Sequence, residues 1–483
     1  MPKLVFSSTQ GKYLDLLVDI FKHSKEKVNI CSVVSDSSIN QGKYLNSENI
    51  RLINEWEIYE TSILEVDYQI VSKFENEELG KSLFKALVID RRMYFGSKTK
   101  VRQSYIPRFT NEELEAKLIK MTATIIREFD NQKPDLCIFF SMTTVQDYII
   151  YSLCKARKIK FLQIRSAKIE NYVMALTDFF ELPKKNSQFE TSEESLKIAR
   201  SYIKKVQNEA MISYEGALLR KRFSLNAAIK RIGAGLKADV KRYFNPVQKQ
   251  DNHIEWLFRN NFYTEILNPI RWNYQKLFFF KQYKSERQYF LYPLHFEPEV
   301  AIQFYGTPYL NQIELIRNIA MSLPIGSELM IKEHPRSYGV RNKNYYKKLQ
   351  EIPRVRLAHH ELSMEYLITH SSGVFTISGS SGLEAIIRGK PCWTFGRTYF
   401  SNICETMVRY IENINEIDEM IFDLTTNYKY EPKKVENFIG CVLENSVPFD
   451  LYTLYLKKFD RYKTGNVELS VNKLFELINR ELD

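Results

Sequence analysis

Short apolar runs alternate with helix-like patterns over the first part of the chain. The runs at 4–6, 28–34, 135–140 and 160–164 are short and nearly continuous, which is typical of buried strands. Apolar residues at helical spacing predict helices over 13–21, 47–59, 111–129 and 145–157. Strands that alternate with helices indicate βαβ units and a parallel sheet. We therefore predict a Rossmann-like domain over residues 1–190.

The same alternation returns after residue 286. Strand patterns at 289–292, 328–332, 355–357, 373–377 and 391–395 are separated by helix patterns at 311–321, 364–369 and 383–388. This predicts a second Rossmann-like domain over 286–430. The stretch 191–285 has few strand signals and Asn-Pro breaks, which favours a helical connector or insertion. Residues 431–483 are predicted to form a helical, polar C-terminal tail. The fold class is α/β, with two domains facing a cleft.

Composition and charge exclude several classes of protein. The chain has 483 residues and 44% apolar residues, which excludes a disordered, collagen-like or coiled-coil protein. The net charge is +11, but Lys and Arg alternate with Asp and Glu, so we do not expect a nucleic-acid partner. The six cysteines lack metal-ligand spacing, and no metal site is predicted. Without a signal-peptide pattern or an 18-residue apolar run, the expected location is the cytoplasm.

Two polar motifs directly follow predicted strands of the second domain, where parallel α/β sheets bind ligands. Lys332-Glu333-His334-Pro335 offers a cation and an imidazole, which suit a phosphate, although His334 could merely cap a neighbouring turn. Ser378-Gly379-Ser380-Ser381-Gly382 precedes a helix whose N-terminus favours anions. A plain helix cap is the alternative, but the run has more Ser and Gly residues than a cap needs. Glu384 could accept hydrogen bonds from ribose hydroxyls.

Carboxylates provide candidates for acid-base chemistry. Glu297 and Glu299 flank Pro298 after the strand at 289–292, where they could hold a sugar or move a proton; Glu299 could instead simply begin a helix. Asp147 follows a strand of the first domain and is the best-placed base, with Glu170 and Asp178 as rivals. An acidic residue in the first turn of a helix is an equally good interpretation of Asp147.

The order of these motifs resembles a known family. FEPE after a strand, then KEHP, SGSSGLEA and GKP, is similar to the capsular polysaccharide biosynthesis proteins, which include β-Kdo transferases with a GT-B fold that use CMP-Kdo. The resemblance covers roughly 285–400. It implies that His334, Ser380 and Ser381 hold the nucleotide phosphate and that no metal or further cofactor is needed. His295 stands where these transferases often have Gln, and Met142-Thr143-Thr144 stands where they often have Pro-His.

The function we predict is therefore a metal-independent glycosyltransferase of bacterial surface polysaccharide synthesis. It would transfer Kdo or a similar acidic sugar from a CMP-activated donor to a glycan or lipid-linked acceptor. One alternative is a CDP-polyol phosphotransferase or a UDP-sugar enzyme of the same fold. Another is a non-catalytic scaffold of an assembly complex.

A basic amphipathic stretch at 218–244 could bind an anionic membrane surface and place the enzyme at the inner face of the cytoplasmic membrane, or it could pack on one of the domains.

Overall fold

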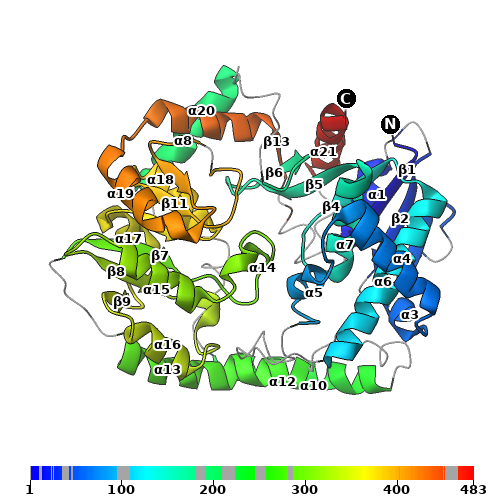
Figure 1. The fold of residues 1–483 in the computed structure, drawn as a ribbon, viewed down its shortest axis with the longest axis horizontal. Helices are drawn as coiled ribbons and strands as arrows, with labels where there is room; N and C mark the ends of the chain where they lie inside the picture. The colour runs from blue at the N-terminus through cyan, green and yellow to red at the C-terminus, as the bar shows by residue number, and fades with distance from the viewer. Residues whose placement is uncertain are drawn as a thin grey trace. The chain divides into compact units, whose positions relative to one another are not determined.

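The computed structural model describes residues 2–9, 13–22, 24, 27–34, 43–44, 47–94, 109–180, 191–208, 224–244, 257–280, 287–401, 403–449, 451 and 466–482. Two compact units are formed (Figure 1). The first unit holds the described residues of 1–95, 106–195 and 440–483, and the second holds those of 196–439. This grouping differs from the four predicted ranges, because the connector belongs with the second unit and the end of the chain with the first.

The first unit is built on a seven-stranded sheet in the order β13-β6-β5-β4-β1-β2-β3. The strands from β5 to β3 in this order are parallel. At one edge β6 pairs antiparallel with β5, and β13 pairs antiparallel with β6. The strands are β1 (Leu4–Thr9), β2 (Asn29–Val34), β3 (Ile50–Asn54), β4 (Leu136–Phe139), β5 (Lys160–Ser166), β6 (Tyr172–Leu176) and β13 (Ser446–Pro448). The helical segments are α1 (Tyr13–Phe21), α3 (Glu55–Glu60), α4 (Glu65–Lys73), η1 (Phe74–Leu79), α5 (Lys85–Ile89), α6 (Asn111–Gln132), α7 (Val145–Arg157) and α21 (Asn466–Leu482).

Local sequence signals explain most of these boundaries. α6 begins at a capping box in which Thr110 and Glu113 bond each other's backbone N–H groups. The predicted helix over 47–59 is wrong, since residues 50–54 form β3 and only α3 is helical. β3 pairs in parallel with β2, and these hydrogen bonds between distant segments outweigh the helical spacing of Ile50, Ile53 and Ile58.

The second unit is built on a six-stranded, all-parallel sheet in the order β12-β11-β10-β7-β8-β9. Its strands are β7 (Tyr289–Pro293), β8 (Glu328–Lys332), β9 (Val355–Leu357), β10 (Val374–Thr376), β11 (Cys392–Thr394) and β12 (Val408–Tyr410). Its helical segments after β7 are α14 (Val300–Gln303), η4 (Thr307–Tyr309), α15 (Gln312–Ser322), η5 (Pro335–Ser337), α16 (Lys343–Gln350), α17 (Met364–His370), α18 (Ser380–Ile387), η6 (Ile414–Glu416), α19 (Ile417–Asn427) and α20 (Pro432–Glu444), whose last residues lie in the first unit.

Both sheets have the strand order of a Rossmann fold, which confirms the predicted α/β class. In each sheet the first strand lies at the centre, and the chain builds outward from it first on one side and then on the other. The order therefore reverses between β1 and β4 in the first unit and between β7 and β10 in the second. Ligands of such sheets bind beyond the carboxyl ends of the strands at this switch point.

The connector is helical where it is described and is anchored to the second unit. Its elements are α8 (Glu193–Asn208), α10 (Leu225–Tyr243), α12 (Leu257–Phe262), η3 (Tyr263–Leu267) and α13 (Asn268–Phe279). Trp272 stacks on Tyr338 at a ring separation of 3.9 Å. Gly339, at a φ of 74°, lets α13 approach closely, because a Cβ there would lie 2.1 Å from the carbonyl oxygen of Asn268.

The end of the chain is not a separate polar tail. β13 adds a strand to the first sheet, beside β6. The buried residues Val471, Leu474, Leu477 and Ile478 of α21 pack in the same apolar core as Leu17 of α1. Among the described residues, no helix is long and apolar enough to span a membrane.

Candidate functional site

The switch point of the second sheet is occupied by His295. This residue follows β7, and its side chain reaches the end of β10, where Nε2 accepts from the N–H of Ile377 at 3.1 Å and lies 3.3 Å from Thr376 Oγ1. Gln312 at the start of α15 bonds both backbone groups of His295. The imidazole thus joins the ends of two strands that are far apart in the sequence.

The Ser/Gly run lies beside this histidine, but it begins the helix earlier than predicted. α18 starts at Ser380, so Ser380 and Ser381 form its first turn, and Gly379 is the N-cap residue. The first N–H groups of a helix have no intrahelical acceptors, so they can bind an anion. Ser380 is exposed and Ser381 is half-buried. Ser378 instead turns inward and donates to the carbonyl of Ala301 at 2.9 Å.

Two glycines of this run permit close packing. A Cβ on Gly379 would lie 2.9 Å from Thr376 Oγ1 and 3.2 Å from His295 Cε1. A Cβ on Gly382 would lie 2.9 Å from Thr376 Cγ2 and 3.0 Å from a ring carbon of Phe400. These two positions hold the start of α18 close to β10.

Glu384 lies further along α18 than predicted and forms an ion pair with Arg388 at 3.3 Å. Burial raises the pKa of Glu384, and the guanidinium of Arg388 opposes this shift.

The KEHP loop follows β8, the strand next to β7. His334 caps the short turn η5, and its Nδ1 accepts from the N–H of Arg336 at 3.2 Å. Burial lowers the pKa of His334 to about 4, and the charges of Arg336 and Arg341 add to this effect. At neutral pH the ring is therefore uncharged, with Nε2 carrying the proton. Pro335 opens the turn η5.

Lys332 bonds backbone carbonyls rather than a carboxylate. Its ammonium donates to the carbonyl oxygens of His359 at 3.2 Å and His360 at 2.8 Å, just beyond β9. Burial lowers the pKa of Lys332 to about 8. The lysine thereby links the ends of β8 and β9 and keeps a positive charge at this edge of the sheet.

A buried ion-pair network supports these loops. Its centre is Arg341, which was not predicted from the sequence. The Arg341 guanidinium lies 3.1 Å from Glu297 and 3.0 Å from Glu333, and it also donates to the carbonyl of His295. Burial alone would lower the pKa of Arg341, but Glu333 and other neighbouring groups hold it well above its usual value. Glu333 also accepts from the Tyr346 hydroxyl at 2.8 Å.

The geometry gives Glu297 and Glu299 different surroundings. Glu297 is buried, paired with Arg341, and accepts a hydrogen bond from Gln312. Glu299 is half-buried at the N-cap position of α14. No local sequence pattern marks Arg341, because its role depends on three loops that meet only in the folded chain.

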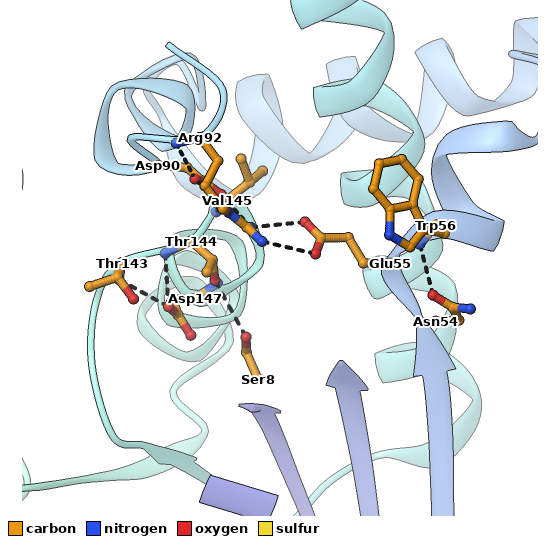
Figure 2. A network of polar contacts seen from close by, with 10 residues as sticks. All are labelled: Ser8, Asn54, Glu55, Trp56, Asp90, Arg92, Thr143, Thr144, Val145 and Asp147. Atoms are coloured by element: carbon orange, nitrogen blue, oxygen red, sulfur yellow. Dashed lines mark hydrogen bonds and ion pairs between the residues drawn. The ribbon is translucent and has the colours of Figure 1, made fainter. Parts of the chain in front are cut away.

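The first unit has a polar network at its own switch point, beyond the ends of β1 and β4 (Figure 2). Asp147 lies in the first turn of α7 and accepts from the N–H groups of Thr143 at 3.0 Å and Thr144 at 2.9 Å. Thr144 Oγ1 accepts in return from the N–H of Asp147 and lies 3.4 Å from Ser8 Oγ. Burial raises the pKa of Asp147 to about 6, although these hydrogen bonds lower it.

A second part of this network was not predicted. Arg92 binds Glu55, the first residue of α3, at 2.9 Å and Asp90 at 2.6 Å, as Figure 2 shows. Asp90 also accepts from the N–H of Val145, which ties the cluster to the start of α7. Burial raises the pKa of Glu55 to about 7, against the opposing charge of Arg92. A carboxyl group with such a pKa can gain or lose a proton near neutral pH.

The rival bases of the first unit lie elsewhere. Glu170 is exposed in the turn between β5 and β6. Asp178 lies 3.8 Å from Lys155 and accepts from the N–H of Phe180. Within the described ranges, no group of three or more His, Cys, Asp or Glu side chains is placed to hold a metal ion.

Comparison with known proteins supports the resemblance seen in the sequence. Residues 275–408 match the family model of the capsule polysaccharide biosynthesis proteins. This range contains His295, the KEHP loop, Arg341 and the start of α18. No curated protein sequence matches the chain.

Several solved structures have a similar course of the chain at low identity. The β-Kdo 2,7-transferase KpsC of Thermosulfurimonas dismutans is 10% identical over 78% of this chain and 98% of its own, with a TM-score of 0.32. The UDP-GlcNAc 2-epimerase of Methanocaldococcus jannaschii is 14% identical over 91% and 99%, with a TM-score of 0.25. A glycosyltransferase of Rickettsia africae is 11% identical over 95% and 97%, with a TM-score of 0.27.

Proposed function

We propose that this chain is a glycosyltransferase of surface polysaccharide synthesis that binds a CMP-activated acidic sugar in its second unit. The observation that supports it best is the meeting of three sequence-distant groups at one edge of the sheet. His295 and the start of α18 lie at the switch point, and the KEHP loop ends the adjacent strand. All three fall in the range that matches the capsule family model.

The hydrogen-bond donors of this site suit a single phosphate group. The N–H groups and hydroxyls of Ser380 and Ser381 donate to its oxygens, and His334 donates from Nε2. In the transfer, the acceptor oxygen forms a bond to the anomeric carbon as the bond from that carbon to the phosphate oxygen breaks. CMP leaves with the electron pair, and these donors stabilise its charge. Lys332 adds a positive potential near the site.

The acceptor hydroxyl must lose a proton in the same reaction. We assign this proton to a carboxylate of the first unit, with Asp147 as the base. Its pKa of about 6 leaves it mostly ionised at neutral pH and makes it a stronger base than an ordinary aspartate. Glu55 is the second candidate, because burial raises its pKa to about 7.

Calorimetric titration with CMP, UMP and UDP tests the donor. We expect CMP to bind most tightly, and the double variant Ser380→Ala/Ser381→Ala and the single variant His334→Ala each to weaken it at least about tenfold. Ser62→Ala, an exposed serine of the first unit, is the matched control and should leave binding unchanged. Tighter binding of UDP, or unchanged CMP affinity in the folded variants, would overturn the donor assignment.

The base is tested by Asp147→Asn with the donor CMP-Kdo and a Kdo-primed glycolipid acceptor. The amide oxygen can still accept from Thr143 and Thr144, so the start of α7 should persist. We expect kcat to fall at least about 100-fold while CMP binding is unchanged. An unchanged kcat would leave Asp147 as a helix cap only and move the assignment to Glu55.

A further inference from the structure

α10 has one side that is already packed. Asp239 accepts from the N–H groups of Leu257 at 3.0 Å and Phe258 at 2.8 Å, and so caps the start of α12. Arg231 pairs with Glu265 at 2.6 Å. Ala228 and Asp239 are buried, and a Cβ on Gly235 would meet the backbone of Leu257. α10 and α12 therefore form a hairpin whose inner side needs no further partner.

Another side of α10 exposes a stripe of large apolar residues. They recur at steps of four, seven, four and three residues, which places them on one line along the helix. Ile229 is 59% exposed, and the other members have similar exposure. The stripe consists of Leu225, Ile229, Leu236, Val240 and Tyr243. A shallow apolar cavity of about 390 Å³ continues it onto Phe244 and Phe258. A stripe of this length is more than the scattered apolar residues of an ordinary protein surface.

Lysines run along one side of the stripe. Lys230, Lys237 and Lys241 recur at steps of seven and four residues, about a third of a turn of the helix away from the apolar line. All three are exposed. The single carboxylate of α10 is Asp239, which is buried against α12, so the exposed surface of this helix carries positive charge without negative charge.

We propose that this face of α10, the stripe with its three lysines, docks on an anionic lipid bilayer. A helix with an apolar line and adjacent lysines lies in the interface, with the apolar side chains among the acyl chains and the ammonium groups at the phosphates. A protein partner would have to supply a matching apolar groove and carboxylates, whereas a bilayer supplies apolar and anionic groups along its whole surface. The Arg220-Lys221-Arg222 cluster of the same predicted stretch lies outside the described residues.

This inference goes beyond the proposed transfer reaction and does not depend on the donor. It would place the enzyme where a lipid-linked acceptor is found. α13 supports the same inference, because its residues Ile270, Tyr274, Leu277 and Phe278 are also exposed at helical spacing.

Co-sedimentation of the full chain with vesicles tests the proposal. We expect binding to vesicles of 70% phosphatidylcholine and 30% phosphatidylglycerol, weaker binding at 0.5 M NaCl, and little binding to phosphatidylcholine alone. Lys230→Gln/Lys237→Gln/Lys241→Gln should weaken partitioning roughly 100-fold. Ile229→Ser/Leu236→Ser should weaken it at least about tenfold.

Two control variants carry the same chemical changes on other exposed sites of the second unit. Lys343→Gln/Lys347→Gln/Lys348→Gln removes three charges from α16, and Met321→Ser/Ile325→Ser removes two exposed apolar side chains. Both should bind vesicles as the unchanged chain does. No binding to anionic vesicles, equal binding to neutral ones, or equal losses in the controls would overturn the proposal. So would a dimer in lipid-free solution that Ile229→Ser/Leu236→Ser dissociates, since a second copy would then cover the stripe.

Discussion

Arg341 shows how one side chain can hold several loops in place. It is buried, and it contacts the loop after β7 through Glu297 and the carbonyl of His295, and the loop after β8 through Glu333. Its own carbonyl accepts from Gln275 of α13 at 2.8 Å. The loops of the proposed nucleotide site are thus held by a cation that is itself buried.

Replacing this cation should strongly destabilise the second unit. Arg341→Met leaves the charges of two buried carboxylates without a balancing cation, for which we expect a loss of about 3–5 kcal/mol. Hydrogen exchange of the β7 and β8 amides measures it. Adding Glu297→Gln and Glu333→Gln should recover part of the loss, because no charge then remains unpaired. Arg317→Met breaks an exposed pair with Glu314 and should cost at most about 1 kcal/mol. Equal effects of the two single Arg variants would contradict the role of Arg341.

His334 should make stability depend on pH. Its folded pKa of about 4 lies below the ordinary value of 6.5, so the unfolded chain takes up the proton first as the pH falls. The contribution is therefore present above pH 6.5 and is lost between pH 6.5 and 4. Between pH 7 and pH 5 we expect the free energy of unfolding to fall by roughly 2 kcal/mol more than in His334→Asn, which keeps an acceptor for the Arg336 N–H. Urea unfolding at the two pH values measures the difference, and parallel curves would contradict the buried, neutral ring.

At the scale of elements, the seating of α18 on the sheet depends on Gly382. A Cβ there would lie 2.9 to 3.1 Å from Thr376, Phe400 and Cys392, so Gly382→Ala should push the helix away from β10 and β11. We expect a loss of about 1–3 kcal/mol and weaker CMP binding. Gly233→Ala in α10 is the matched control. It meets nothing within 4 Å and should stabilise its helix by about 0.5–1 kcal/mol. Thermal unfolding and CMP titration of both variants check this, and a neutral Gly382→Ala would show that α18 is free to shift.

The sequence predicts regular elements better than it predicts how they meet. β8 and α7 have the bounds expected from their apolar patterns, because every residue of β8 and most residues of α7 are buried. β3 was missed because its identity depends on pairing with β2 rather than on its own spacing. Arg92 and Arg341 were missed for a related reason. Each joins carboxylates that are distant in the sequence, and no local pattern marks such a cation.

At the scale of the whole molecule, the end of the chain completes the first unit rather than the second. Leu474 of α21 is fully buried in the core that also contains Leu17, whereas Leu469 of the same helix is 56% exposed. Leu474→Ala should destabilise the first unit by about 2–5 kcal/mol, and Leu469→Ala should have little effect. Hydrogen exchange should become faster in β1 and β5 and remain unchanged in β7 and β8, because the two units have separate cores. CMP binding should persist in the variant, since the proposed nucleotide site lies in the second unit. Faster exchange in both sheets would show that the units unfold together, and unchanged exchange in β1 would show that α21 does not support this core.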